Sequence, residues 1–433
     1  MIFLKWAVPR ERVCRAWCLY DGANSAFATV ILTALFPVYF SQSVVPDRGL
    51  CLLAHCVPGP SLWAYGVSIS VLIAALFAPL AGKVADTYGL RKPLFILFVL
   101  SGAGATAMML FAYPGWVWYA LVCFLIGHLS FLFADVMYNS YLPIIAPENK
   151  HDILSSQGYA WGYVGGGLLL AFQFFILGLP GIRIEHNDFF IIRLCLASVG
   201  IWWLLFSLPA MVWLPASAIE GLTKHSVSEP SCDGFLSSLK RIKETPGALL
   251  FLTAFFFYNN GIQTVISMAA IYGSYRLGIT QKELMGALLV TQFVAFPGAL
   301  LFGFLADKFG TLRILLGNLA VWCLIVTYAV WIRRSLEFWI LAGLSGLVLG
   351  GSQALSRSAF TKFIKDNRSG EFFGFYAMGG RFSSLLGPFV FGMVFDATRS
   401  MEVSILSVLF FFLMGAVLLW SCRVRWNGYS GVS

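Results

Sequence analysis

The chain has 433 residues, of which 59% are hydrophobic and only 11% are charged, and its net charge is +9. Soluble proteins are about 45–50% apolar and about 25% charged, so this composition excludes a soluble globular fold. Because a membrane-spanning helix needs about 20 apolar residues, the length accommodates roughly twelve spans and little else. The predicted fold class is an all-α polytopic membrane protein.

The positive charge does not indicate a nucleic-acid partner, because Lys and Arg are spread between apolar blocks instead of forming a basic face. We expect the partners to be a small-molecule substrate and membrane lipid, and we expect the chain to act as a monomer. No cofactor and no metal site is expected.

Apolar blocks between charged or Pro/Gly-rich breaks predict twelve helices in two groups. The first group spans 16–44, 62–85, 93–113, 115–140, 156–178 and 191–214. The second group spans 247–272, 284–306, 312–331, 337–359, 371–396 and 403–422. We therefore expect an N-terminal six-helix half (1–214), a cytoplasmic linker loop (215–246) and a C-terminal six-helix half (247–433).

The distribution of positive charge predicts the orientation. Of the 29 Lys and Arg residues, twenty fall on the side that holds both termini and the linker, eight fall on the other side, and Arg381 lies inside a span. Cytoplasmic loops carry the excess of Lys and Arg, so we expect both termini in the cytoplasm and the chain in the bacterial inner (plasma) membrane. No small-residue cleavage site follows the first apolar block, so we expect a retained span and not a signal peptide.

The loop after the second predicted helix has a counterpart in the other half. The two sequences are Gly82-Lys-Val-Ala-Asp86-Thr-Tyr-Gly89-Leu-Arg91-Lys92 and Gly303-Phe-Leu-Ala-Asp307-Lys-Phe-Gly310-Thr-Leu-Arg313. Matched positions are 221 residues apart, an offset that Gly166 and Gly387 share. This internal repeat predicts two pseudo-symmetric halves that face each other across a central cavity.

The pattern Gly-x-x-x-Asp-x-x-Gly followed by Arg-Lys resembles the signature loop of the major facilitator superfamily of secondary transporters. In that superfamily the loop is a cytoplasmic latch, which holds one face shut and yields when the halves rock. The resemblance implies gating roles for the residues of both copies, which are Gly82, Asp86, Gly89, Arg91, Lys92, Gly303, Asp307, Gly310 and Arg313.

A narrower resemblance covers most of the chain. The segment Tyr20-Asp21-Gly22-Ala23-Asn24-Ser25-Ala26-Phe27-Ala28-Thr29 is similar to the opening of the autophagy-related vacuolar effluxer branch and its bacterial relatives. So are Tyr258-Asn-Asn-Gly-Ile-Gln-Thr264 and Gly380-Arg-Phe-Ser-Ser-Leu-Leu-Gly-Pro388. Gly22 stands where the branch leads us to expect Trp, and Asn260 stands where we expect Asp, which removes a carboxylate from the seventh helix. Fungal members of this branch are implicated in amino-acid efflux from the vacuole.

Polar residues inside membrane spans are costly and mark candidate paths for a solute or an ion. They concentrate here on the first helix of each three-helix unit, and the tenth helix contributes Ser345, Ser352 and Ser356. The candidate path residues are Asp21, Asn24, Ser25, His128, Asp135, Asn139, Asn260, Gln263, Thr264 and Arg381. The alternative is that these residues form hydrogen bonds that only hold the bundle together.

Asp135 is the residue that we expect to couple transport to an ion gradient, with H⁺ or Na⁺ as the coupling ion. His128 precedes it by seven residues on the same helix face and is expected either to relay the proton or to shift the titration of Asp135. Asp21 is the competing site, but its place near the cytoplasmic start of the first helix predicts that it is hydrated and permanently ionised. Arg357 ends the tenth helix, where we expect it to face cytoplasmic water. The alternative, which Arg381 shares, is that it neutralises a helix carboxylate or holds a substrate carboxylate.

The motifs that are absent also limit the function. The sequence contains no phosphate-binding loop of an ATP-driven pump and no His-Glu-x-x-His, paired Cys-x-x-Cys or Gly-x-Ser-x-Gly of an enzyme. In the loop Cys51-Leu-Leu-Ala-His55-Cys56, unpaired thiols, a disulfide and a metal site that includes His55 all remain open.

The sequence therefore predicts a permease and not an enzyme. We expect a secondary active transporter that moves a small solute by alternating access. The leading hypothesis is efflux of an amino acid or metabolite, coupled to protons. Two alternatives stay open. One is a sensor or scaffold that keeps the fold without transporting, and the other is a translocator of lipid or lysolipid.

Overall fold

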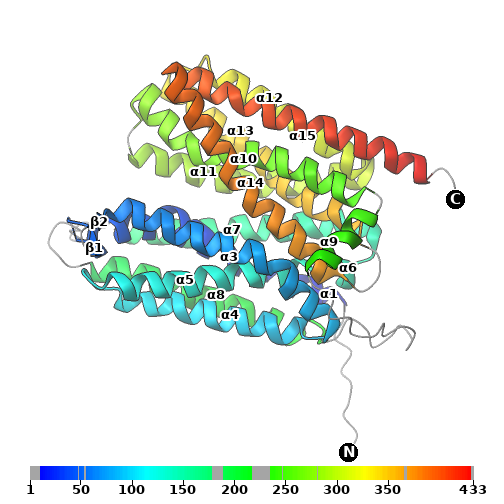
Figure 1. Ribbon diagram of the computed structural model, residues 1–433, viewed down its shortest axis with the longest axis horizontal. Helices are drawn as coiled ribbons and strands as arrows, with labels where there is room; N and C mark the ends of the chain where they lie inside the picture. Colours follow the sequence, from blue (N-terminus) through cyan, green and yellow to red (C-terminus); the bar gives the residue numbers. More distant parts are fainter. Residues whose placement is uncertain are drawn as a thin grey trace, which may run out of the picture.

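The computed structural model describes residues 10–46, 48–52, 55–177, 189–216, 235–245, 247–279, 281–364 and 368–430. Within these ranges twelve helices are long and apolar enough to cross a membrane, which confirms the predicted number. Figure 1 shows them as two bundles, one blue to green and one green to red, whose helices run in roughly the same direction. The all-α architecture of two six-helix halves is as predicted.

The first span of the N-terminal half, Arg10–Val44, is not a uniform α-helix. It consists of α1 (Arg10–Ala26), the π-helical turns η1 (Phe27–Ala34) and η2 (Phe40–Val44), and α2 (Phe36–Tyr39) between them. The other long helices of this half are α3 (Gly59–Thr87), α4 (Arg91–Met108), α5 (Val117–Asn139), α7 (His151–Leu177) and α8 (Phe190–Trp213). Short turns are η3 (Met109–Phe111), α6 (Leu142–Ile145) and η4 (Glu148–Lys150).

The C-terminal half contains α10 (Ala248–Leu277), α11 (Gln281–Phe309), α12 (Thr311–Ala329), α13 (Ser335–Thr361), α14 (Ser369–Thr398) and α15 (Met401–Ser430). Within the polar linker lies one further helix, α9 (Phe235–Glu244). Each half buries its own apolar core, with Trp203 fully enclosed in the first and Trp322 in the second. The two cores also touch, because Tyr163 of the first half belongs to the second core and Ala377 of the second half packs against the first core.

A two-stranded hairpin, which the sequence did not predict, interrupts the helical pattern. Strands β1 (Leu50–Leu52) and β2 (His55–Val57) pair antiparallel with Cys51 opposite Cys56. The two cysteines form a disulfide, which settles the alternatives left open for this loop. The hairpin marks one end of the molecule, called here the hairpin face; the opposite end, where α1 begins and α9 lies, is called the linker face (Figure 1).

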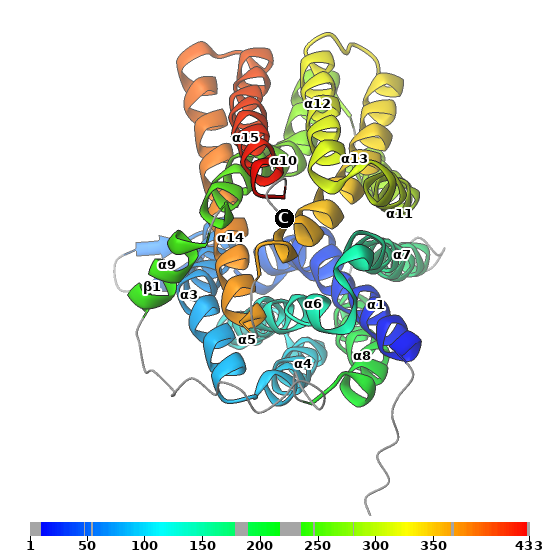
Figure 2. The same cartoon turned by 90° about the vertical axis from the view of Figure 1, so that its right-hand side faces the viewer.

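Contacts between the halves run mainly along two helix pairs, α3 with α14 and α7 with α11. Figure 2 views the linker face and shows both pairs, with the end of α13 between the bundles. At several points these pairs approach so closely that a side chain would not fit. A Cβ atom on Gly82 would lie 1.9 Å from the carbonyl oxygen of Gly370, and one on Gly303 would lie 2.2 Å from Ser156 Oγ.

Inside the N-terminal half, α1 and α7 also depend on glycine. A Cβ atom on Gly165 would lie 2.2 Å from the carbonyl oxygen of Gly22, whereas a Cβ atom on Gly104 of α4 would meet nothing within 4 Å. Gly165→Ala is therefore expected to destabilise the folded state by about 1–3 kcal/mol through overpacking. Gly104→Ala is the matched control, because it brings the same gain in helix propensity without a clash.

Thermal unfolding in detergent measures both variants. We expect a lower Tm for Gly165→Ala and an unchanged or slightly higher Tm for Gly104→Ala. Equal Tm values for the two variants would contradict the close packing of α1 on α7.

Candidate functional site

A cavity of about 130 Å³ lies between the two halves. Five helices, α5, α7, α10, α13 and α14, contribute its lining. The lining residues are Asp135, Tyr159, Phe255, Asn259, Ile262, Gln263, Ser352, Gln353, Ser356, Tyr376, Ala377, Gly380 and Arg381. Sites for drug-sized ligands measure about 300–1,000 Å³, so this cavity suits a small solute.

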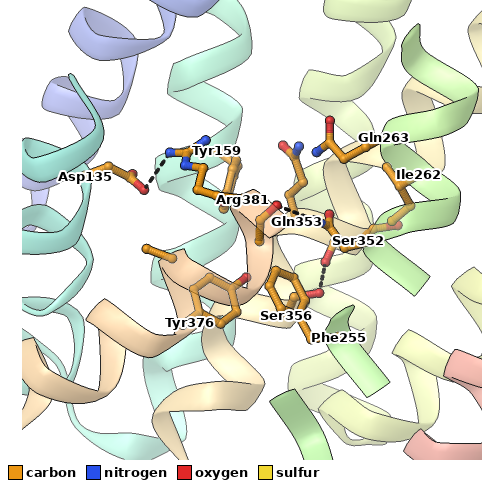
Figure 3. A pocket seen from close by; sticks show the side chains of 13 residues that line it. Asp135, Tyr159, Phe255, Ile262, Gln263, Ser352, Gln353, Ser356, Tyr376 and Arg381 are labelled. Carbon is orange, nitrogen blue, oxygen red and sulfur yellow. Dashed lines mark hydrogen bonds and ion pairs between the residues drawn. The ribbon is translucent and has the colours of Figure 1, made fainter. Parts of the chain in front are cut away.

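One charge pair crosses the cavity from half to half. Arg381 Nη2 of α14 lies 3.8 Å from Asp135 Oδ2 of α5, and both side chains are 29% exposed (Figure 3). The sequence predicted both residues on the path, and the structure brings them together. An intramembrane ion pair that remains partly open can exchange its partner for a charged solute group.

Neutral hydrogen-bonding groups complete the cavity. Asn259 Nδ2 donates to the carbonyl oxygen of Gly380 at 3.3 Å, and Tyr163 donates across the halves to Gln353 Oε1 at 2.7 Å. The hydroxyl groups of Ser356 and Tyr258 are 2.7 Å apart. Ser352, Ser356 and Gln263, which the polar pattern of their helices singled out as candidates, lie in the cavity lining.

Next to the cavity, towards the linker face, lies a second charge pair between the halves. Arg357 of α13 is only 1% exposed, and its Nη1 donates to Asp21 Oδ2 of α1 at 3.1 Å. The same nitrogen lies 3.2 Å from Asn139 Oδ1. Two predictions are wrong here: Arg357 does not face water, and Asp21, 7% exposed, is not hydrated.

At the linker face itself, Asp86 accepts hydrogen bonds from the first turn of the opposite half's α14. The amide nitrogens of Gly370 and Glu371 donate to its two carboxylate oxygens at 3.1 and 2.9 Å. Arg91 pairs with Asp86 and donates to Ser369 Oγ at 3.0 Å. A carboxylate at a helix N-terminus is favourable because it meets free N–H groups and the positive end of the helix dipole.

Other members of the first loop act within their own half. Gly89 has φ = +65°, which ends α3 in a conformation that suits glycine, and Gly310 has φ = +92° at the same place in the second half. Lys92 Nζ donates to the carbonyl oxygens of Val212 and Leu214 at the end of α8, so it caps a neighbouring helix.

The second copy of the loop does not make the same contacts. Asp307 and Arg313 are exposed, in contrast to Asp86 and Arg91, whose side chains are each 6% exposed. Asp152 of α7 makes the contact instead: it accepts from Thr311 Oγ1 at 2.6 Å and lies 3.9 Å from Lys362 Nζ. The two copies of the loop are therefore similar in sequence, but their contacts with the opposite half differ.

Several predicted path residues lie in packed contacts away from the cavity lining. Asn260 is fully buried and accepts from the amide of Gly387 at 2.9 Å, and Thr264 Oγ1 donates to the carbonyl oxygen of Asn260 at 2.6 Å. His128 Nδ1 lies 2.7 Å from Ser70 Oγ among aromatic rings, so the proposed relay to Asp135 is not formed. Asn24 accepts from Tyr20 at 3.4 Å inside the N-terminal core.

Ser25 is half-buried, and its Oγ faces Gly162 of α7, where a Cβ atom would lie 2.7 Å away. It therefore belongs to the α1–α7 contact. Sequence reasoning missed several cavity residues, chiefly Tyr159, Asn259, Gln353 and Tyr376. Asn259 carried a usable signal, because it adjoins Asn260 in a polar stretch, but only the rotation of the helix decides which of the two faces the cavity.

Solved structures with a similar fold are transporters of the major facilitator superfamily. The human organic anion transporter MFSD10 (TETRAN) superposes with a TM-score of 0.71 at 15% identity, covering 95% of this chain and 100% of that chain. The superfamily transporter FucP in its outward conformation has a TM-score of 0.68 at 14% identity, covering 96% and 99%. The chain is thus an integral membrane protein with the major facilitator fold, and these neighbours are transporters, not enzymes.

Sequence comparison places the chain within this class. A family model described as "Vacuole effluxer Atg22 like" matches residues 10–427, so the chain belongs to that family. It is 32% identical to the uncharacterized MFS-type transporter YxiO of Bacillus subtilis, with 93% of both chains covered. It is 24% identical to autophagy-related protein 22 of Saccharomyces cerevisiae, covering 92% of this chain and 89% of the relative.

The two copies of the loop provide a matched test of the latch. Asp86→Ala removes two hydrogen bonds to a carboxylate, each worth about 1.5–3 kcal/mol, and is expected to favour opening of the linker face at least about tenfold. Asp307→Ala changes an exposed residue and is expected to have no effect.

A cysteine at Ser156 reports the opening, because this residue is 1% exposed in the α7–α11 contact. With the other thiols removed, we expect Ser156→Cys to react with a maleimide at least about tenfold faster in the Asp86→Ala background. Equal acceleration by Asp307→Ala would show that both copies of the loop hold the face shut, against the asymmetry described above.

Proposed function

We propose that this protein is a secondary transporter that moves a small zwitterionic solute, an amino acid, by alternating access of the central cavity. The observation that carries the proposal is the Asp135–Arg381 pair, in which a carboxylate of one half faces a guanidinium of the other. The ammonium group of an amino acid matches Asp135, and its carboxylate matches Arg381. The family description as effluxers supports export as the direction.

A solute that binds between the two halves can shift the equilibrium between their arrangements. A zwitterion that replaces the direct ion pair contacts α5 through its ammonium group and α14 through its carboxylate. The affinity for the solute therefore differs between the open and closed arrangements of the halves. Only such a difference in affinity between two states shifts the equilibrium between them. The neutral groups of Asn259, Gln263 and Gln353 provide further hydrogen bonds for orienting the solute.

We propose the proton as the coupling ion and Asp135 as its site. A proton on Asp135 removes the charge that holds Arg381, so the loaded cavity and the empty cavity differ in their charge balance. Because one chain supplies both halves of the cavity, a monomer is sufficient for the cycle. The excess of Lys and Arg on the linker face supports a cytoplasmic location of that face, in the inner membrane of a bacterium.

The chemistry of the solute is tested in proteoliposomes by exchange of a labelled amino acid. We expect the free amino acid to compete, whereas its methyl ester, which lacks the carboxylate, and its N-acetyl derivative, which lacks the ammonium group, compete at least about tenfold less well. Equal competition by all three compounds would contradict recognition by the Asp135–Arg381 pair.

The coupling proposal is tested by Asp135→Asn, which keeps the shape of the side chain and removes its charge. Accumulation driven by a pH gradient is expected to disappear, while exchange of solute between the two sides survives at a reduced rate. Asp396→Asn is the control, because that carboxylate is 78% exposed. If Asp135→Asn still concentrates solute against its gradient with an unaltered pH profile, Asp135 is not the coupling site.

A further inference from the structure

The surroundings of Arg357 have the composition of a receptor for a guanidinium group. Its Nε donates to Ser155 Oγ at 2.9 Å and its Nη2 donates to the carbonyl oxygen of Ser155 at 2.7 Å. Its Nη1 meets Asp21 and Asn139, as described above. Three aromatic rings surround the charge: its Cζ atom lies 4.1 Å from the ring centroid of Tyr159, 4.7 Å from Trp17 and 5.5 Å from Tyr138.

All of these partners belong to the N-terminal half, while Arg357 belongs to the C-terminal half. The backbone of α7 also leaves room for the charge at Gly158, where a Cβ atom would lie 2.8 Å from Arg357 Nη2 and 2.9 Å from Asp21 Oδ2. The N-terminal half thus contains a complete site, with a carboxylate, oxygen acceptors, aromatic faces and a space shaped for a planar cation. In this conformation the other half of the same chain fills it.

This receptor adjoins the solute cavity. Tyr159 lines the cavity and also stacks on the Arg357 guanidinium, and Figure 3 shows its ring beside Arg381. When the halves separate at the linker face, Arg357 moves away with α13 and leaves Asp21 without its cation. A carboxylate left unpaired in such surroundings is costly, so the open state favours a replacement cation.

We propose that Trp17, Asp21, Tyr138 and Tyr159 form a cation-binding site that takes the side-chain guanidinium or ammonium group of the transported solute whenever Arg357 is withdrawn. The inference rests on the proposed function and narrows its substrate class to basic amino acids. Closure of the linker face returns Arg357 to the receptor and displaces the solute cation. The same arginine therefore acts as a gate and as an internal competitor of the substrate.

Chemical rescue tests the receptor without transport. Arg357→Ala removes the equivalent of N-ethylguanidinium, so this cation is expected to raise the Tm of the variant in a saturable manner, by about 2–4 °C. Ethylurea, a neutral analogue of similar shape, is expected to have no such effect. The double variant Asp21→Asn/Arg357→Ala should lose the rescue, and Arg313→Ala, at an exposed arginine, should show none.

A second measurement keeps the proposal testable if Arg357→Ala does not fold. In the otherwise native chain that carries Ser156→Cys, N-ethylguanidinium should accelerate maleimide labelling, because it stabilises the state from which Arg357 has left. If ethylurea raises the Tm or accelerates the labelling as much as N-ethylguanidinium does, the receptor proposal is overturned. An equal rise in Tm for Arg313→Ala also overturns it.

Transport separates this inference from the proposed function. We expect arginine to exchange at least about tenfold faster than citrulline, which replaces the guanidinium with a neutral group of nearly the same shape. If the two exchange equally, the inference fails while amino-acid transport stands. If no amino acid exchanges at all, the proposed function and the assigned substrate class fail together, and the Tm rescue alone decides whether the receptor exists.

Discussion

The division of charge between the two halves is the constraint on which this structure depends. Asp21, Asp135 and Asp152 lie on the N-terminal half, and the cations that face them, Arg357, Arg381 and Lys362, lie on the C-terminal half. Asp86 adds a fourth carboxylate, which pairs with Arg91 of its own half and faces the N-terminus of α14 across the interface. Each of the contacts across the interface is made when the halves meet and lost when they part.

This arrangement of charges favours a protein whose halves alternate between closed and open states over one whose halves stay closed. Charges that are buried between two rigid bundles stabilise closure only while they are paired, because an unpaired charge in the same surroundings is unfavourable. Separation of the halves thus requires water, a proton or a charged solute to take the place of each partner. The N-terminal half then presents carboxylates and aromatic rings to cations, and the C-terminal half presents guanidinium groups to anions. A zwitterion satisfies both surfaces at once.

The contacts also form an order from the linker face inwards. Asp86 and Asp152 hold the outermost turns, Arg357 fills the receptor in α1, α5 and α7, and the Asp135–Arg381 pair borders the cavity itself. Across the halves, the outer carboxylates face backbone amides, short hydroxyl side chains and Lys362, whereas each inner carboxylate faces a guanidinium group. The inner pairs are therefore the ones whose partners a solute can imitate.

The sequence was sufficient to predict the twelve helices and the two six-helix halves, because apolar block length and the repeated loop depend on local patterns. The gating role of Asp86, which the family resemblance implies, stays a prediction. It did not predict the burial of Arg357, since a cation at a helix end faces water unless another part of the chain covers it. It placed Asn260 in the cavity where the structure has Asn259, because adjacent helix positions differ by about 100° and tertiary packing sets the rotation. It also expected Asp307 to match Asp86, but Asp307 is exposed and Asp152 makes the contact between the halves, because similar loop sequences meet different surfaces in the two halves.

The most direct test of this account measures distances between spin labels on opposite halves. One pair replaces Tyr88 and Phe309 on the linker face, and another replaces Trp116 and Trp331 on the hairpin face; all four side chains are exposed. Addition of arginine in a lipid nanodisc is predicted to shift the linker-face pair towards a longer distance and the hairpin-face pair towards a shorter one. Distance distributions that stay unchanged at both faces, with arginine bound, would contradict the claim that the charge pairs between the halves separate during transport.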